Sequence, residues 1–256
     1  MQQFDRARLL ATDILKSNRT DRSATLVLAH ALMAQNRHVE AIEPLERVMR
    51  RSSDAEIETL LGAVLCGARR ATDGIEQLRR TAARRPPYLP AIQELAGQLS
   101  KAGQLNEAIR TIEDALALAS DSIDLKLDLG RLLLDNNDRA AARDILTVAR
   151  DAAPGRPDIL TELGRALLLD GEYPAAADAF RHALGLRPQD PLARANLAAC
   201  LLEMGERDGG EAALRSVMRG RPQMLGRAAY ALSAASHGRF FFRPSAIAKF
   251  LGRDQA

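Results

Sequence analysis

Histidine and cysteine, the side chains most often used as metal ligands and nucleophiles, are few and scattered in this sequence. No histidine has a second one at the spacing of a metal site, and the cysteines are too distant for a disulfide scaffold or a cysteine-rich zinc module. These residues are His30, His38, His182, His237, Cys66 and Cys200. Both thiols have small and apolar neighbours, as buried structural thiols do. We therefore expect no metal site, no disulfide and no cofactor.

The sequence also offers no motif for phosphate binding or acid–base catalysis. Gly209 and Gly210 lack the lysine that a phosphate-binding loop requires, and we interpret residues 208–210 as a turn between two helices. The carboxylates follow the pattern of solvated helix faces instead of converging. We therefore expect a protein that is not an enzyme.

Charge narrows the class of partner. The chain of 256 residues has 36 Lys and Arg against 33 Asp and Glu, which gives a formal net charge of +3. Bases and acids are interspersed, whereas a groove that binds a polyanion needs one sign of charge sustained along it. We expect no nucleic-acid partner.

No segment predicts a membrane span. Runs without a charged residue, such as 228–238, are well short of the ~20 apolar residues that a spanning helix needs. The N-terminus places Asp5 in its first turn and has no apolar core of the kind that an export signal requires. We expect a cytoplasmic protein, or a periplasmic one if an upstream signal has been removed.

The hydrophobic pattern recurs, and residues 157–190 show it best. Two apolar stripes at helical spacing are separated by a polar turn around Gly171, and Pro188 stops the second stripe. Small residues on the stripes allow two helices to approach closely, so the pattern predicts a helix hairpin. The stripes contain Leu160, Leu163, Gly164, Leu167, Ala176, Phe180 and Ala183.

Sliding the pattern along the chain by 34 residues reproduces it without gaps, apart from one unit that is a residue shorter. Residues 1–21 fit only the second half of a unit, with Phe4, Ala7, Ala11 and Ile14 on its apolar stripe. Residues 225–256 form a degenerate unit with a Phe-rich end. The complete units are predicted at 22–54, 55–88, 89–122, 123–156, 157–190 and 191–224.

In this pattern the chain resembles the tetratricopeptide repeat (TPR) family over nearly its whole length. The resemblance implies an all-α fold, a right-handed α-solenoid of stacked antiparallel helix hairpins, in which each hairpin covers the next. It also implies a concave groove that is lined by the first helix of each unit and binds a partner peptide or protein. The groove residues expected on this basis are Gln93, Lys101, Asp124, Leu127, Arg131, Asp158, Thr161, Arg165, Leu168 and Asn196.

Two consecutive units repeat an aspartate and an arginine seven residues apart. Because seven residues make two helical turns, Asp124 and Arg131 share one face, as do Asp158 and Arg165. These pairs could contact a ligand. Alternatively, the aspartates are first-turn acids favoured by the helix dipole, and the arginines pair with neighbouring units. The pattern of the TPR domains that grip a chaperone's C-terminal carboxylate is matched only at Asn196, which argues against that subtype.

The last stretch concentrates four phenylalanines. Phe240, Phe241, Phe242 and Phe250 are expected to cap the last apolar surface of the stack; the alternative is an exposed docking hook.

The expected function is a non-catalytic protein-interaction scaffold in a bacterial assembly, secretion or envelope-polysaccharide system. Two alternatives are a regulatory or targeting region of a larger enzyme, such as a transferase, and a homo-oligomer that assembles through its ends.

Overall fold

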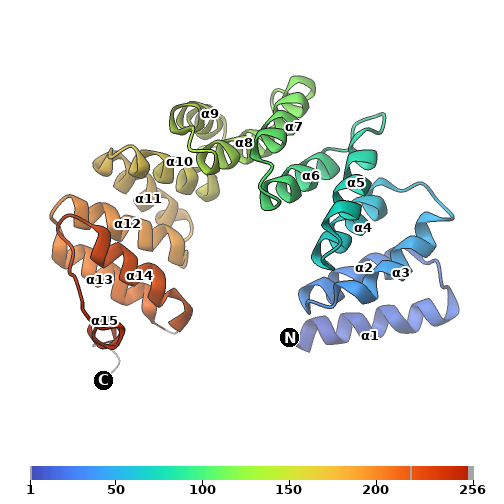
Figure 1. Cartoon of the computed structure of the whole chain (residues 1–256), viewed down its shortest axis with the longest axis horizontal. Helices are drawn as coiled ribbons and strands as arrows, with labels where there is room; N and C mark the ends of the chain where they lie inside the picture. Colours follow the sequence, from blue (N-terminus) through green and yellow to red (C-terminus); the bar gives the residue numbers. More distant parts are fainter. Residues whose placement is uncertain (1, 220, 253–256) are drawn as a thin grey trace. The chain divides into compact units, whose positions relative to one another are not determined.

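The computed structural model describes residues 2–219 and 221–252, which form helices and contain no β-strand. Figure 1 shows their order along the chain. The helices are α1 (Gln2–Ser17), α2 (Arg22–Ala34), α3 (His38–Met49), α4 (Ala55–Gly67), α5 (Ala71–Ala82), α6 (Leu89–Lys101), α7 (Leu105–Leu118), α8 (Ile123–Asp135), α9 (Arg139–Ala152), α10 (Pro157–Leu169), α11 (Tyr173–Leu186), α12 (Pro191–Glu203), α13 (Arg207–Met218), α14 (Leu225–Ala234) and α15 (Pro244–Leu251), with a 3₁₀ turn at Pro222–Met224.

The chain divides into two compact units, unit 1 (Met1–Asp128) and unit 2 (Leu129–Ala256), with the boundary inside α8. In unit 1 each helix from α1 to α7 packs against the next one along the chain, and α4 also touches both α2 and α6. In unit 2 the same holds from α9 to α14, and α12 touches both α10 and α14. Each unit is therefore a stack of helix hairpins with the even-numbered helices in one layer, which confirms the predicted α-solenoid fold.

The turn inside each hairpin places one residue in the left-handed region of backbone conformation. Glycine and asparagine tolerate this region best, whereas other side chains are strained there. The turn residues are Asn36, Arg69, Gly103, Asn137, Gly171 and Gly205, and from Arg69 onward they are spaced by 34 residues. Because Gly205 makes the last of these turns, residues 208–210 lie in the first turn of α13. Their interpretation as an inter-helix turn was wrong.

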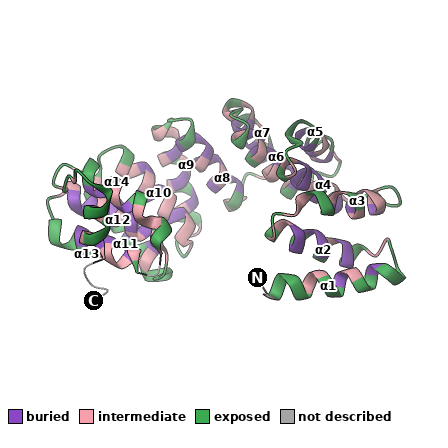
Figure 2. Ribbon diagram, turned by 60° about the horizontal axis from the view of Figure 1, so that its bottom comes forward, coloured by how far each residue is buried: buried purple, intermediate pink, exposed green. Residues whose placement is uncertain are grey.

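In several hairpins the two helices meet where a glycine receives a large side chain. A Cβ atom added to Gly62 would lie 2.5 Å from Leu78 Cγ, and one added to Gly164 would lie 2.9 Å from the Phe180 ring. Leu78 and Phe180 are fully buried. The buried residues in Figure 2 lie where helices of a unit meet, and the turns are exposed.

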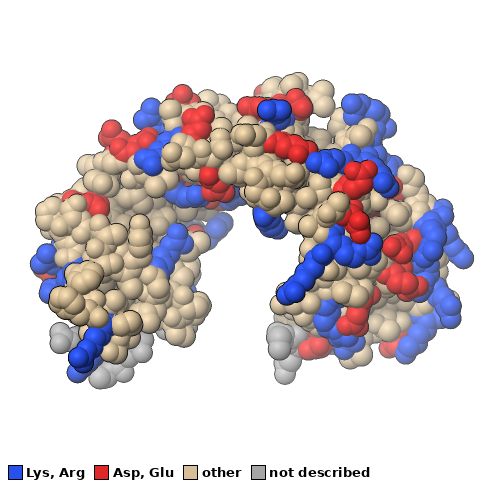
Figure 3. All heavy atoms as spheres, viewed as in Figure 1, with Lys and Arg blue, Asp and Glu red and all other residues tan. Residues whose placement is uncertain are grey.

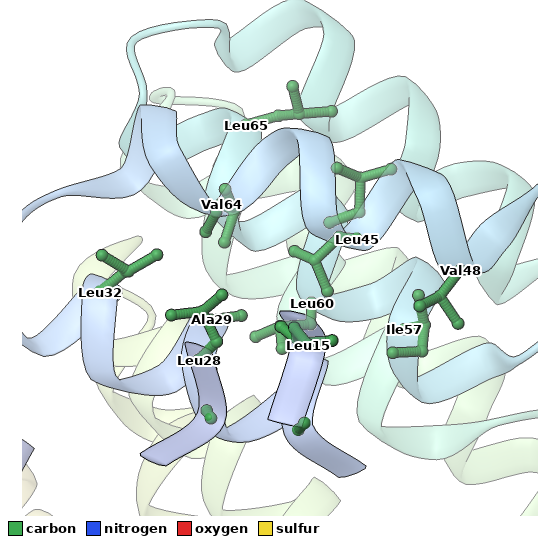
Figure 4. Packing of buried hydrophobic residues seen from close by; sticks show 14 residues of the cluster. Leu15, Leu28, Ala29, Leu32, Leu45, Val48, Ile57, Leu60, Val64 and Leu65 are labelled. Carbon is green, nitrogen blue, oxygen red and sulfur yellow. The ribbon is translucent and has the colours of Figure 1, made fainter. Parts of the chain in front are cut away.

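The core of unit 1 shows how far the half-unit at the N-terminus follows the predicted stripe. Ala11 and Leu15 of α1 pack into a cluster with side chains of α2, α3 and α4 (Figure 4). Phe4 and Ile14, which the sequence pattern also placed on the packed stripe, are exposed. The stripe was wrong at these two residues, because α2 covers only the face of α1 that contains Ala11 and Leu15.

The core of unit 2 contains Cys200, a fully buried residue of α12 that packs with Phe180 and neighbouring alanines. Burial raises the pKa of the Cys200 thiol to about 12. Burial also raises the pKa of the less deeply buried Cys66. Both groups stay protonated near neutral pH and are poor nucleophiles there.

The contact at Gly62 can be tested with alanine. Gly62→Ala should lower the free energy of unfolding by about 1–3 kcal/mol, because the new methyl group collides with buried Leu78 and the carbonyl of Gly74. Gly97 in α6 is the matched control, since a Cβ there meets nothing within 4 Å. Gly97→Ala should raise stability by ~0.5–1 kcal/mol through helix propensity. Urea denaturation followed by far-UV circular dichroism measures both, and equal effects would contradict the packing argument.

The buried thiol predicts a loss of stability in alkali. An unfolded thiol ionises near pH 8.5 whereas folded Cys200 stays neutral to about pH 12, so protons are released on unfolding and stability falls as pH rises. Below about pH 8 the buried thiol of Cys200 makes its whole contribution to the free energy of unfolding. At pH 10 this free energy should be about 2 kcal/mol lower because the unfolded thiol ionises. Urea titrations at pH 8 and pH 10 measure this fall in the free energy of unfolding. The fall should be smaller for Cys200→Ala than for the wild type, whereas Cys66→Ala should keep the part that is due to Cys200. Identical losses in wild type and Cys200→Ala would contradict this assignment.

Candidate functional site

Unit 2 contains a hollow of about 380 Å³ along its even-numbered helices, which we name the unit 2 groove. Residues of α10, α12 and α14 form most of its wall, together with Tyr173 at the start of α11. Its lining consists of Arg165, Leu168, Leu169, Tyr173, Ala195, Asn196, Ala199, Glu203, Arg227, Tyr230, Ala231, Ala234 and Ala235. Three residues predicted from the sequence are therefore brought together: Arg165, Leu168 and Asn196.

The groove combines a floor of small residues with charged and aromatic side chains. Ala195 and Ala231 are buried, so only short side chains separate the groove from the helices beneath it. Tyr230 is 73% exposed. Arg227 is exposed and forms no ion pair with the residues that the structure describes. Glu203 accepts a hydrogen bond from the backbone N–H of Ser236 at 3.3 Å.

Arg165 is held by carboxylates on two helices. Its guanidinium lies 2.7 Å from Asp135 on α8 and 3.2 Å from Glu162 on its own helix. Burial opposes its charge, but the hydrogen bond to Asp135 and the charge of Glu162 prevail and raise its pKa. Arg131 on α8 also reaches Glu162, at 3.1 Å. Both arginines thus pair with carboxylates across two predicted units, as the alternative interpretation proposed.

The aspartate of the predicted Asp–Arg pair on α10 has a different partner. Asp158 lies 2.6 Å from Arg156, two residues before it. This hydrogen bond lowers the pKa of the Asp158 carboxyl group. The hydroxyl of Thr161, one turn further along, donates to the carbonyl of Pro157 at 2.7 Å. Neither Asp158 nor Thr161 lines the unit 2 groove, and a role for them in binding stays a prediction.

The remaining predicted residues lie outside the unit 2 groove. The Gln93 amide in unit 1 donates to Asp128 at 2.6 Å, and Lys101 is exposed at the end of α6. On α8, Asp124 lies in the first turn, and Leu127 is 3% exposed and cannot offer a surface to a ligand as it stands. A binding role for these four residues is not supported by a pocket and stays a prediction.

Sequence reasoning missed the α14 side of the groove. Arg227 and Tyr230 lie in the degenerate unit at 225–256, in which no groove residue was predicted because the repeat pattern fades there. Residues 225–237 nevertheless have the apolar spacing of a first helix. A step of 34 residues leads from Asn196, a predicted groove residue, to Tyr230, but no predicted groove residue leads by that step to Arg227.

The four phenylalanines of the C-terminal end divide into two pairs. Phe241 and Phe250 are partly buried, lie 5.3 Å apart between ring centroids, and pack on the last apolar cluster of unit 2. Phe240 and Phe242 are exposed, with ring centroids 5.4 Å apart in an edge-to-face arrangement. Phe241 and Phe250 thus lie where the predicted cap would be, and Phe240 and Phe242 are as exposed as the alternative docking hook would require.

Buried Glu211 on α13 holds this end in place. Its carboxylate pairs with Arg215 at 3.3 Å and with Arg239. The two guanidinium groups also lie over the ring of Phe250, at 4.8 Å and 5.2 Å from its centroid. Ion pairing and cation–π contacts therefore attach the C-terminal segment to α13.

Residues 2–219 and 221–252 contain no cluster of three or more His, Cys, Asp or Glu side chains able to hold a metal ion. Among the helices of the same residues, none has both the length and the apolar character required to cross a membrane.

Solved structures with the same fold come from different settings. TTC0263, a TPR protein of Thermus thermophilus, is 21% identical, with a TM-score of 0.58 over 71% of this chain and 98% of that chain. Pseudomonas aeruginosa pilF is 16% identical, with a TM-score of 0.64 over 86% of this chain and 94% of that one. The Cut9–Hcn1 hetero-tetramer of the APC/C contains a chain that is 16% identical, with a TM-score of 0.64 over 99% of this chain and 53% of that one. At sequence identities this low, the similarity to these structures establishes the fold of the chain and nothing more.

The sequence itself matches two profiles described as tetratricopeptide repeat. One matches residues 1–56, 95–157 and 127–191, and the other matches residues 167–235. Comparison with curated proteins gave no significant match. The profiles cover more than half of the chain and agree with the helix hairpins. The chain therefore belongs to the tetratricopeptide repeat family, whose repeats indicate a protein-interaction scaffold.

Proposed function

We propose that the protein is a non-catalytic scaffold that binds a peptide segment of a partner protein in the unit 2 groove. The observation that supports this most directly is the lining of that groove. Small side chains leave open space along three helices, and the exposed side chains of Tyr230 and Arg227 border it. Pockets with a mainly apolar floor and a few polar groups are typical binding sites.

The lining favours a particular kind of peptide. The alanines of α12 and α14 leave room for an apolar side chain of the ligand, which would lose its contact with water there. Arg227 offers hydrogen-bond donors to a carboxylate without first breaking an ion pair to any described residue. Arg165 is already satisfied by Asp135 and Glu162, so it shapes the wall more than it attracts charge. The proposed ligand therefore presents an apolar residue next to an acidic one.

The setting is part of the same proposal. We place the scaffold in a bacterial assembly, secretion or envelope-polysaccharide system, on the basis of its Arg-rich and Lys-poor composition. The Cut9–Hcn1 hetero-tetramer contains a chain of this fold in an assembly with other chains, which is compatible with a scaffold role.

A photo-crosslinking amino acid can test whether the groove is the binding surface. p-Benzoylphenylalanine at Ala199 in the groove should crosslink one partner protein in cells of the source organism, and mass spectrometry identifies it. The same group at Ala212, exposed on α13, is the matched control and should not crosslink that partner. Equal crosslinking from both positions would reject the groove.

The charge of the groove can then be tested with the identified partner. Arg227→Glu should weaken binding by about tenfold or more, because it replaces attraction of a carboxylate by repulsion. Arg110→Glu makes the same charge change on α7 of unit 1, outside the groove, and should leave the affinity unchanged. Isothermal titration calorimetry measures both variants. An unaltered affinity of Arg227→Glu would show that the ligand does not contact this side of the groove.

A further inference from the structure

The C-terminal part of the chain has a charge pattern unlike the rest. Between Glu211 and Asp254 the sequence contains no acidic residue. The basic residues of this stretch are Arg215, Arg219, Arg221, Arg227, Arg239, Arg243, Lys249 and Arg253. In Figure 3 the surface of unit 1 shows Lys, Arg, Asp and Glu close together, whereas the visible surface over α14 and α15 shows Lys and Arg among uncharged residues. In the rest of the chain acidic residues offset the basic ones, whereas every charged residue between Glu211 and Asp254 is basic.

Two phenylalanines project from the same stretch. Phe240 is 72% exposed and Phe242 is 94% exposed, and their rings contact each other instead of the core. Phe241 between them packs on the core instead. Exposing two neighbouring aromatic rings to water is unfavourable, and such exposure is typical of a surface that is covered in the functional state.

The segment that presents these rings is fixed to the end of unit 2. The backbone N–H of Arg239 donates to the carbonyl of Leu232 at 2.7 Å, which closes the turn after α14. A Cβ at Gly238 would lie 1.8 Å from that carbonyl oxygen, so the turn requires glycine. On the far side of the rings, Phe250 and Leu251 of α15 pack into the same apolar cluster. The exposed rings are therefore held between two anchored points and are not part of a free tail.

The cations beside the rings differ in their availability. Arg215 and Arg239 are paired with Glu211 and help to hold the segment. Arg243, next to Phe242, and Lys249, on α15, are exposed and form no ion pair with any described residue. Two of these cations therefore stabilise the C-terminal segment itself, and Arg243 and Lys249 are available to an external anion.

From this arrangement we infer that residues 240–249 dock the protein onto an anionic lipid bilayer. Phe240 and Phe242 enter the interfacial region of the membrane, and Arg243 and Lys249 contact the anionic headgroups. The rings protrude from the surface, which suits a deformable phase better than the surface of a folded partner. Headgroup phosphates supply the negative charge that this stretch of the chain lacks.

Vesicle sedimentation with the full chain tests this inference. The wild-type protein should bind vesicles of equimolar phosphatidylcholine and phosphatidylglycerol at least about tenfold more tightly than vesicles of phosphatidylcholine alone, and added salt should weaken the binding. The double variant Phe240→Ser and Phe242→Ser should lose about tenfold or more in the partition coefficient. So should Arg243→Glu combined with Lys249→Glu, because the attraction becomes repulsion.

Matched controls separate docking from general stickiness. Val39→Ser combined with Leu118→Ser removes two exposed apolar side chains of unit 1, and Arg50→Glu combined with Arg110→Glu reverses two exposed charges there. Both controls should bind vesicles as the wild type does. Circular dichroism and thermal melting establish that all variants are folded, as expected for exposed positions.

Three results would overturn the inference. The first is equal binding to neutral and anionic vesicles, and the second is wild-type binding by the Phe240→Ser and Phe242→Ser variant. The third is a wild-type dimer in sedimentation velocity that this variant converts to a monomer, without vesicle binding by either protein. That outcome would assign the exposed rings to a second copy of the chain.

Discussion

The rest of the structure depends on a contact seen in three helix hairpins, in which a glycine of the first helix receives a large, fully buried side chain of the second. Gly62 with Leu78 and Gly164 with Phe180 are two instances, and a single methyl group on either glycine would collide with its partner. The contact fixes the distance between the two helices of a hairpin, and so it also fixes where the next hairpin packs. Because protein interiors are close-packed, a wider spacing in one hairpin would disturb its neighbours in the stack.

The same use of small residues creates the candidate site. The alanines of α12 and α14 permit close packing of the even-numbered helices, and where they face solvent they leave the groove open. Charge serves a different purpose in unit 2. Most of its carboxylates near the groove are taken up by ion pairs between helices, so the exposed cation of Arg227 stands out as the group available to a ligand. The sustained positive charge near α15 follows from the absence of acids in the sequence and needs no special geometry.

The fold could be predicted because a repeat multiplies a weak pattern until it becomes specific, and the helix hairpins follow from the spacing of leucines and alanines. Only part of the predicted groove lines a pocket in the structure. The sequence could not tell which carboxylates the two groove arginines would pair with, and the packing of the helices decides that Arg131 and Arg165 share Glu162. Sequence spacing also could not decide which face of α1 is covered. For the C-terminal phenylalanines, the sequence allowed both a cap and a hook. In the structure Phe241 and Phe250 pack on the apolar cluster at the end of unit 2, whereas Phe240 and Phe242 are exposed, so both interpretations apply, each to one pair.

One of the left-handed turn residues leaves room to stabilise the stack at a position outside the proposed binding surfaces. Five of the six turns use glycine or asparagine, but the turn between α4 and α5 uses Arg69, whose side chain makes that backbone conformation unfavourable. The strained residue lies at a hairpin turn of unit 1, whereas the groove and the basic C-terminal segment belong to unit 2. A single substitution at this turn can therefore offset a destabilising change in either proposed binding surface, so new residues can be tolerated there without loss of the fold.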